Sequence, residues 1–558
     1  MSNRPSKAAI YAVLAAASVA TLLAVGFIAP VATTDSAEAA ELHSISGHVG
    51  RDDVRLPTFG IPAFIQVYRA GSDDLIAWGE SSGSGDYTIA GIPDGEYQLR
   101  YSHTRNPDDT SLGYASMWFG GTPYHLEATV VTLAGEDLRA DIDLPIAGAI
   151  AGRINAPWTA PGNDLVAWAY LIEPDGALEL VTGWSGTSGA YQLRGLPAGS
   201  YLVKFTNGSG GADGAAYRPE WWPDVRLSVD ADEVHVVSGS TTPNIDAWLS
   251  PWQPAVIDRV AGADRFEAAA AMSAGTFEPG VPVVMVANGL NFPDALSAGP
   301  AAAVLGGPVL LVTPSAIPPS IGAELERLAP QRIVVVGGPA SVSEAVLSEL
   351  SGFATTVERI TGGDRYEVSR NVAAYAFSEP SMEYFQVLFA DGRGFADALS
   401  AGAAAANSGF PLVLVNGGRP ELDAETKSLL TDLHPFHTWI IGGPNSVHSG
   451  FDDSLRSNGF STQRIGGADR FAVSAGLTAY FSVTNHDEIV FFATGFNFPD
   501  ALAGAPVAAA TRANLLLVPR DCVPIVTLQA MQQRSLSDVV LLGGPASLGS
   551  GVENLIPC

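Results

Sequence analysis

Three Gly-rich turns, each followed by the sequence Asp-Ala-Leu, hold the residues of this chain that are best suited to bind a charged ligand. Each turn places one aspartate just before a helical stretch. A carboxylate in that position can bind a cation that bridges to phosphate, or it can accept hydrogen bonds from the free N–H groups that begin a helix. We favour the helix cap and keep the cation site as the alternative. These aspartates are Asp294, Asp397 and Asp500.

An Asp-Arg pair stands upstream of each turn, and its arginine is the second candidate ligand group. The planar guanidinium group suits forked contacts to phosphate or carboxylate. It is equally suited to fixing a loop or an interface between domains through a protein carboxylate. The sequence therefore leaves both a polymer-binding and a structural role open. These arginines are Arg265, Arg365 and Arg470.

The charge of the chain restricts what such groups could bind. There are 58 acidic residues against 29 lysines and arginines, a formal charge of −29. General nucleic-acid binding is not expected, because it needs clustered basic residues to neutralise phosphates. Any anionic ligand would be repelled at long range, so its binding would depend on local arginines, helix N-termini or a bridging divalent cation. That cation is the single cofactor we consider, and no protein-held metal site is predicted.

Residues that could form a catalytic site are few. His434, His437 and His448 lie close together in one copy of the C-terminal repeat, but the other two copies lack them. The sequence contains no H-E-x-x-H or CxxC pattern and no G-x-S-x-G turn with plausible partners. We therefore expect the chain not to be an enzyme.

The elements that position the Asp and Arg residues recur three times in the C-terminal half. Each copy opens on an Asp-Arg pair, alternates helical stretches with short apolar runs, and ends after a Gly-Gly-Pro turn. Such runs between helices are typical of buried parallel strands with crossover helices. Each copy is therefore predicted to be a small open α/β domain. The openings are RVAGADRF at 259–266, RITGGDRY at 359–366 and RIGGADRF at 464–471.

This series resembles the cell-wall-binding repeat type 2 family of exported Gram-positive proteins. The resemblance lies in the Gly-x-Asp-Arg openings, the Phe-Pro/Ala-Asp-Ala-Leu turns and the Gly-Gly-Pro-x-Ser ends over residues 255–558. It implies three α/β modules in a pseudo-threefold arrangement and noncovalent attachment to an anionic cell-wall glycopolymer. In this family a short aliphatic motif is also linked with attachment, although by its composition it is a core strand. It corresponds here to Val309, Leu310, Leu311, Leu412, Val413, Leu414, Leu515, Leu516 and Leu517.

The N-terminal half carries a different repeat. SGDYTIAGIPDGEYQLRY at 84–101 matches SGAYQLRGLPAGSYLVKF at 188–205, and both alternate apolar with polar residues as antiparallel strands do. The pattern resembles the carboxypeptidase-regulatory-like and Cna-B-like families, which implies two prealbumin- or Ig-like β-sandwiches of unknown partner. The aromatic residues of SMWFGGT at 116–122 and EWWPDV at 220–225 could stack on a sugar, but core packing is the favoured interpretation.

The two ends of the chain predict export and a disulfide bond. Arg4 and Lys7 precede an apolar run and a small-residue cleavage pattern, which indicates a signal peptide, with a retained anchor as the alternative. No transmembrane span is expected after its cleavage. The two cysteines of the chain, Cys522 and Cys558, are predicted to pair.

The predicted organisation is therefore multidomain, with two all-β modules followed by three α/β repeats. We expect a secreted, noncatalytic protein of the cell wall or surface of a Gram-positive, actinobacterial organism. A wall-active, amidase-like hydrolase and an adhesin whose β domains bind protein or carbohydrate stay open as alternatives. The expected segments are a signal peptide at 1–40, β modules at 41–145 and 146–251, and repeats at 252–355, 356–460 and 461–558.

Overall fold

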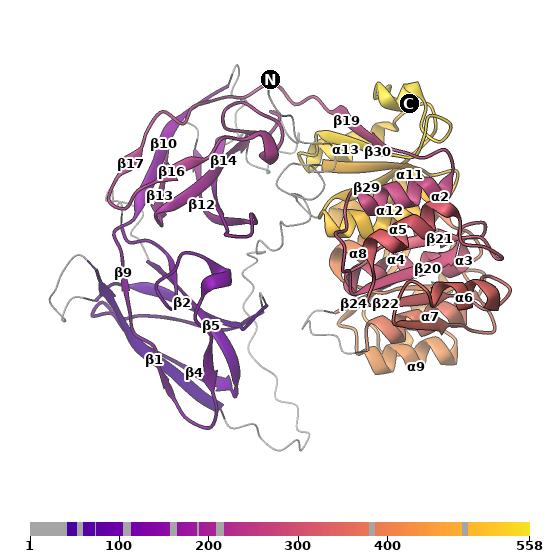
Figure 1. The fold of residues 1–558 in the computed structure, drawn as a ribbon, viewed down its shortest axis with the longest axis horizontal. Coiled ribbons are helices and arrows are strands. Elements are labelled where there is room, and N and C mark those ends of the chain that lie inside the picture. Colours follow the sequence, from indigo (N-terminus) through magenta and orange to yellow (C-terminus); the bar gives the residue numbers. More distant parts are fainter. Residues whose placement is uncertain are drawn as a thin grey trace. The chain divides into compact units, whose positions relative to one another are not determined.

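The computed structural model describes residues 42–52, 60–72, 74–103, 113–156, 165–186, 189–207, 217–378, 385–481 and 489–558. The described residues divide mainly into a β unit, which ends at Pro251, and an α/β unit over Trp252–Cys558 (Figure 1). The signal peptide predicted at 1–40 lies outside them. Among the described residues, no helix has both the length and the hydropathy that a bilayer crossing requires.

The first part of the β unit consists, in its described residues, of two sheets around one core that contains Ile45, Ile65 and Leu99. One sheet has the strand order β4-β1-β8, with β9 also pairing to β1, and the other has the order β3-β2-β5-β6, with β7 pairing to β5. The strands are β1 (Leu42–Arg51), β2 (Ala63–Arg69), β3 (Leu75–Glu80), β4 (Asp86–Pro93), β5 (Gly95–His103), β6 (Met117–Trp118), β7 (Val131–Leu133), β8 (Leu138–Arg139) and β9 (Ile142–Leu144).

The second part repeats this topology, which is the structural counterpart of the sequence match. Its sheets have the orders β13-β10-β17, with β18 pairing to β10, and β12-β11-β14-β15, with β16 pairing to β14. The strands are β10 (Gly148–Asn155), β11 (Leu165–Ile172), β12 (Leu178–Gly186), β13 (Ala190–Leu196), β14 (Gly199–Asn207), β15 (Glu220–Trp221), β16 (Val234–Val236), β17 (Thr241–Thr242) and β18 (Ala247–Trp248).

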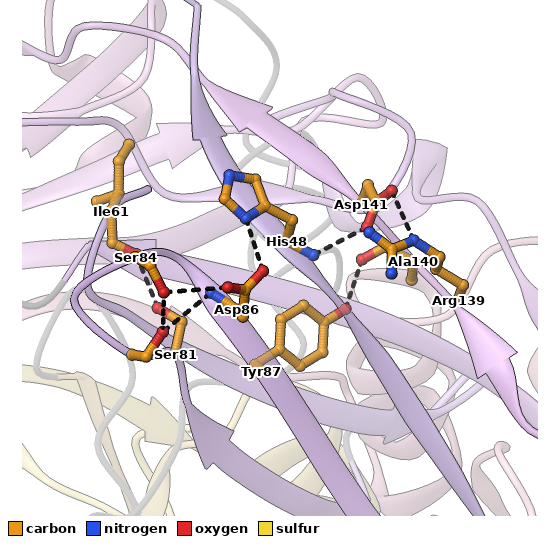
Figure 2. A network of polar contacts seen from close by, with 10 residues as sticks. His48, Ile61, Ser81, Ser84, Asp86, Tyr87, Arg139, Ala140 and Asp141 are labelled. Carbon is orange, nitrogen blue, oxygen red and sulfur yellow. Dashed lines mark hydrogen bonds and ion pairs between the residues drawn. The ribbon is translucent and has the colours of Figure 1, made fainter. Parts of the chain in front are cut away.

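The tyrosine of the repeated Ser-Gly-x-Tyr motif connects distant strands of its own module. Tyr87 donates its hydroxyl group to the carbonyl oxygen of Ala140 over 2.6 Å (Figure 2). Tyr191 makes the same 2.6 Å bond to Ile245 in the second module. Burial raises the pKa of Tyr87 to about 12, so this side chain stays a neutral donor at physiological pH. The motif is therefore explained by the fold and needs no ligand.

One tryptophan of each aromatic stretch is buried, as predicted, whereas Trp222 is partly exposed. Trp118 is 4% exposed and stacks on His125 with 4.3 Å between ring centroids. Trp221 is 1% exposed and packs with Tyr170 and Leu202. Because neighbouring side chains cover these rings, a sugar cannot stack on them.

The described residues of the α/β unit form three four-stranded parallel sheets, with the orders β21-β20-β22-β23, β25-β24-β26-β27 and β29-β28-β30-β19. The strands are β19 (Ala255–Val260), β20 (Val283–Asn288), β21 (Val309–Val312), β22 (Arg332–Val336), β23 (Thr356–Ile360), β24 (Gln386–Asp391), β25 (Leu412–Val415), β26 (His437–Ile441), β27 (Thr462–Ile465), β28 (Ile489–Thr494), β29 (Asn514–Val518) and β30 (Asp538–Leu542).

Helices connect these strands. Three of them, α4, α8 and α12, contact one another, and each is rich in alanine and glycine, which permits close approach. The helices are α2 (Arg265–Ala274), α3 (Pro293–Leu296), α4 (Ala298–Val304), α5 (Pro319–Leu328), α6 (Glu344–Leu350), α7 (Arg365–Ala376), α8 (Ala396–Ser408), α9 (Ala424–Leu433), α10 (Gly450–Ser457), α11 (Arg470–Phe481), α12 (Pro499–Ala510), α13 (Ile525–Gln533) and α14 (Ser550–Glu553).

Each sheet is completed by the strand that precedes an Asp-Arg motif. β23 pairs with β22 and β27 with β26, while β19, at the start of the unit, pairs with β30 near its end (Figure 1). The next helix, α2, α7 or α11, then packs on β21, β25 or β29 of a different sheet. The boundaries expected at 355/356 and 460/461 therefore fall within a sheet. The first lies between the sheet of β20 and its fourth strand, β23, and the second lies between the sheet of β24 and its fourth strand, β27. The Asp-Arg motifs lie where the chain passes from one sheet to another.

The predicted disulfide bond between Cys522 and Cys558 is present. It holds the last residues against the third copy, where Val523 also forms an isolated bridge with Pro557. The two cysteines are 36 residues apart, and closing a loop of this length stabilises a fold by about 3–4 kcal/mol in the chain-entropy account.

Candidate functional site

Three phenylalanine rings, one from each copy, meet where the first strand of each copy ends. Their centroids are 5.6, 5.8 and 6.0 Å apart, and the rings pack edge to face. Each ring is only half-buried, although it contacts the other two. These phenylalanines are not among the candidate residues expected from the sequence. The sequence signal for them is the phenylalanine that stands before Pro-Asp or Ala-Asp in all three turns. The rings belong to Phe292, Phe395 and Phe498.

The arginine of each Asp-Arg motif lies over the phenylalanine of a neighbouring copy. Arg265 lies over Phe498, Arg365 over Phe292 and Arg470 over Phe395, each with its guanidinium carbon 5.7 to 5.8 Å from the ring centroid. All three arginines are partly exposed. The structure thus brings the three predicted arginines together around one aromatic centre. We call these three arginines and three phenylalanines the Arg–Phe ring.

Backbone contacts hold the arginines in place. The Nη1 group of each donates to the carbonyl oxygen of the glycine that follows the first strand of its own copy. The acceptors are Gly289 at 2.8 Å, Gly392 at 2.7 Å and Gly495 at 2.5 Å. The preceding aspartate of the motif does not pair with the arginine. Asp264, for example, caps α2 by accepting from the N–H groups of Phe266 and Glu267. The guanidinium groups are therefore preorganised at the junctions between copies.

Asp294, Asp397 and Asp500 are not helix caps, so the favoured interpretation of these residues is wrong. The cap positions are taken by the phenylalanines, which make no side-chain cap bond. Because each helix begins one residue before its aspartate, the carboxylate lies in the first turn and reaches the Gly-Gly-Pro-x-Ser turn instead. The serines bonded to the three aspartates are Ser341, Ser446 and Ser547.

The first glycine of each Gly-Gly-Pro turn is required by this contact. The glycine has a φ angle of 111° to 115°, a region that residues with a Cβ avoid. A Cβ on any of the three would also collide with the aspartate carboxylate. Turn and aspartate therefore form one packed structure. These glycines are Gly337, Gly442 and Gly543.

Burial raises the pKa of Asp397 and Asp500, and their serine partners and the nearby Arg470 and Arg265 oppose the shift. A raised native pKa means that ionisation of the carboxyl group costs stability. That cost is fully present above the native pKa, declines as the pH falls through it, and vanishes below the unfolded value near 3.8.

The variant Asp500→Asn should therefore be more stable than the parent chain at neutral pH. Asparagine cannot ionise but keeps an oxygen that accepts from Ser547. The gain should shrink as the pH is lowered toward 4, and thermal unfolding between pH 4 and 7.5 measures it. A constant difference across this range would contradict the assigned cause.

A cavity of about 180 Å³ opens between the second and third copies, beside the Arg–Phe ring. One of its acidic groups, Asp391, is paired with Arg393 over 2.9 Å. The cavity is lined by Asp391, Gly394, Phe395, Ala396, Asp397, Ser446 and Arg470.

The aliphatic motif lies inside the sheets. All nine residues belong to β21, β25 and β29, and none is more than 6% exposed. Their side chains pack in the core. Substitutions there would therefore test folding before they tested binding.

The three histidines of the second copy do not form a site. His437 bonds to Ser461, His448 accepts from the N–H group of Gly450, and His434 lies at the C-terminal end of α9. In the part of the chain that the structure describes, no three His, Cys, Asp or Glu side chains are grouped as metal ligands would be.

A polar network in the first β module also fails to match a catalytic arrangement. Asp86 lies between His48, at 3.0 Å, and Ser84, at 3.0 Å (Figure 2). The histidine therefore contacts the carboxylate and not the hydroxyl group, so it cannot act as the base for that serine in this geometry.

Comparison with known proteins bears on the α/β unit. The family described as "Cell wall binding domain 2" matches residues 259–347, 359–451 and 464–553. Two proteins of Bacillus subtilis (strain 168) are similar. The Amidase enhancer is 29% identical over 54% of this chain, and N-acetylmuramoyl-L-alanine amidase LytC is 24% identical over 53%. These alignments cover 40% and 57% of the two relatives' own lengths.

Among solved structures, Cwp6 from Clostridium difficile aligns over 73% of this chain and 68% of its own, with 20% identity and a TM-score of 0.48. Cwp8 from the same organism aligns over 83% and 88%, with 15% identity and a TM-score of 0.48.

Proposed function

Because its three α/β repeats belong to the cell wall binding domain 2 family, we propose that this chain is a noncatalytic protein that holds to an anionic glycopolymer of the cell wall. The observation that carries the proposal is the Arg–Phe ring. It gathers three partly exposed arginines on one surface of a chain whose formal charge is −29.

The ring suits a polymer that alternates charged groups with sugars. Each guanidinium group can make forked contacts to phosphate or carboxylate. At an ionic strength of about 0.15 M, charges more than about 8 Å away are largely screened, so the nearby arginines outweigh the distant acidic surface. The aromatic centre adds apolar surface on which a sugar ring can pack.

The affinity for the polymer comes from three junctions between neighbouring copies, each with one arginine of the Arg–Phe ring. A polymer that already touches one arginine presents its next anionic group at a high effective concentration to the next one. Linked weak contacts can therefore exceed the affinity of a single site by about 10²–10⁴. Asp294, Asp397 and Asp500 contribute indirectly, by holding the turns that border the ring. No bridging cation is needed for this proposal.

The proposal includes a pseudo-threefold arrangement of the repeats, which the cyclic order of the arginine–phenylalanine contacts supports. It also includes two prealbumin- or Ig-like modules that act as spacer or adhesive domains, supported by their shared strand order. Secretion by a Gram-positive cell, with removal of residues 1–40, completes it.

A role beside wall hydrolysis is the second candidate, because the printed names of two relatives refer to an amidase and an amidase enhancer. The chain covers 57% or less of those proteins, so their activities are not carried over to it. Incubation of the purified chain with labelled walls separates the candidates, since a hydrolase would release soluble fragments and an attachment protein would not.

Co-sedimentation of the purified chain with isolated cell walls tests the proposal. We expect the chain to pellet with intact walls and to remain in solution when the anionic glycopolymers have been removed chemically. Added divalent cations or a chelator should have little effect. Equal binding to stripped and intact walls would refute the proposal.

A further inference from the structure

We propose that the junction between the second and third copies is a specialised subsite that binds one anionic sugar unit, with the charged group on Arg470 and the sugar ring on Phe496. This inference rests on the proposed function and refines it. At one of the three junctions, a single repeating unit of the polymer would enter a cavity as well as contact the surface.

Two small residues open this junction. Gly394 and Ala396 line the cavity, and a Cβ added at Gly394 would meet no atom within 4 Å. The equivalent positions in the other copies carry asparagine and proline. Asn291 and Asn497 each fold back so that Oδ1 accepts from the N–H group of the next phenylalanine at 3.0 Å. The second copy lacks these side chains at the cavity that Arg470 lines.

Arg470 is held more firmly than a single stacking contact would hold it. Its guanidinium carbon lies 5.8 Å from the centroid of Phe395 and 5.6 Å from that of Phe496, and its Nη1 group donates to Gly495. A cation fixed between two rings loses little conformational entropy when it binds an anion. It therefore offers a preorganised contact at the edge of the cavity.

Phe496 supplies the sugar platform beside the cavity: it does not line the cavity itself but contacts Arg470, which does. The side chain of Phe496 is 61% exposed, although it packs edge to face on Phe471 with 5.6 Å between centroids. The equivalent residues are Leu290 and Arg393, so the third copy alone presents an aromatic face at this position. Large exposed aromatic surface is costly to leave in water, and the apolar face of a sugar ring can cover it.

The charges and size of the cavity fit one anionic unit. Arg393 pairs with Asp391 at 2.9 Å, and the carboxylate of Asp397 accepts a hydrogen bond from Ser446. Arg470 is the cationic group among the lining residues. A volume of about 180 Å³ is below the roughly 300–1,000 Å³ of pockets that enclose drug-sized ligands. A single phosphate- or carboxylate-bearing sugar is therefore the ligand class we assign.

The test is calorimetric titration of the full chain with glucose 6-phosphate, and with glucuronate, glucose and inorganic phosphate for comparison. We expect one of the two anionic sugars to bind about tenfold or more tightly than glucose or phosphate, which identifies the charged group. The double variant Gly394→Asn/Ala396→Pro copies the sister turns and should lose that binding. Its thermal stability should be equal or higher, since proline is favoured at the first helical position.

A second variant tests the contact with the sugar ring separately from the contact with the charged group. Phe496→Leu copies the first repeat and should weaken binding of the anionic sugar by a larger factor than binding of inorganic phosphate, because phosphate loses only the support that Phe496 gives to Arg470. The inference is overturned if neither anionic sugar binds more tightly than phosphate, or if the double variant binds as well as the parent chain.

Sedimentation with intact walls distinguishes a failure of this inference from a failure of the proposed function. If both the parent chain and the double variant pellet equally and titrate alike, the subsite is refuted and wall attachment stands. If the parent chain binds the sugar but never pellets with walls, the subsite stands and the proposed attachment fails.

Discussion

Replacement of Arg265, Arg365 and Arg470 together by glutamine should release the chain from isolated cell walls. Each substitution removes a charged fork that is worth about 1.5–3 kcal/mol in a hydrogen bond to a charged partner. Because the contacts are linked, the loss should compound, and the apparent affinity should fall by about 100-fold or more. Each single variant should lose much less. Sedimentation with a dilution series of walls measures the difference.

A control variant with the same change in net charge shows whether wall binding depends on the positions of the arginines or on net charge alone. Arg419, Arg456 and Arg520 are exposed arginines of the same unit that lie outside the Arg–Phe ring. Their triple replacement by glutamine changes the net charge by the same amount and should leave wall binding nearly intact. Equal loss in both triple variants would contradict a defined site and favour nonspecific attraction.

The ring arginines also pack on phenylalanines, so folding must be checked separately. The triple variant Arg265→Lys, Arg365→Lys and Arg470→Lys keeps the charge but loses the planar fork. We expect it to bind walls at an intermediate level. If the glutamine variant unfolds, the lysine variant still decides the question, because retention of full affinity by lysine would exclude forked recognition.

Replacement of Gly442 by alanine should have the largest effect on stability. Its φ angle is 115°, which costs a residue with a Cβ about 1–3 kcal/mol, and the added Cβ would collide with the carboxylate of Asp397. Overpacking of this kind costs about a further 1–3 kcal/mol. We expect the α/β unit to unfold at a clearly lower urea concentration, followed by circular dichroism.

Gly322 provides the matched control for this substitution. It lies inside α5, where a Cβ would have neighbours no closer than 4.0 Å, so Gly322→Ala should be neutral or stabilising by up to about 1 kcal/mol. Adding Asp397→Ala to Gly442→Ala should recover part of the loss, because it removes the collision but not the backbone strain. No recovery would show that the aspartate contact is not the cause.

The order of most helices and strands in the α/β unit could be predicted because its signals are local, whereas the strands before the Asp-Arg motifs, β19, β23 and β27, were not predicted. Apolar runs such as the one that forms β20 predict buried strands from their own composition, and glycine or proline marks their ends. The threefold recurrence of Gly-x-Asp-Arg and Phe-x-Asp-Ala-Leu further identified the candidate residues for ligand contact. The pairing of Cys522 with Cys558 followed from the presence of two cysteines in a chain predicted to be exported.

The grouping of those residues depended on tertiary structure. Strand β19 precedes the first copy in sequence, yet it pairs with β30 of the last copy, and no local pattern encodes a partner so distant along the chain. That pairing closes the set of three sheets and so brings Arg265 over Phe498. The same long-range packing turned Asp294, Asp397 and Asp500 from expected helix caps into partners of the Gly-Gly-Pro-x-Ser turns.

The sequence by itself thus determined the elements, the repeats and the candidate arginines, since propensity, periodicity and turn chemistry act over a few residues. Tertiary structure alone decided that three phenylalanines share one centre, that each arginine crosses to a neighbouring copy, and that Gly394 opens a cavity. The physical reason is that these features are contacts between segments roughly 70 or more residues apart in the chain, and packing selects such contacts only after the sheets have formed.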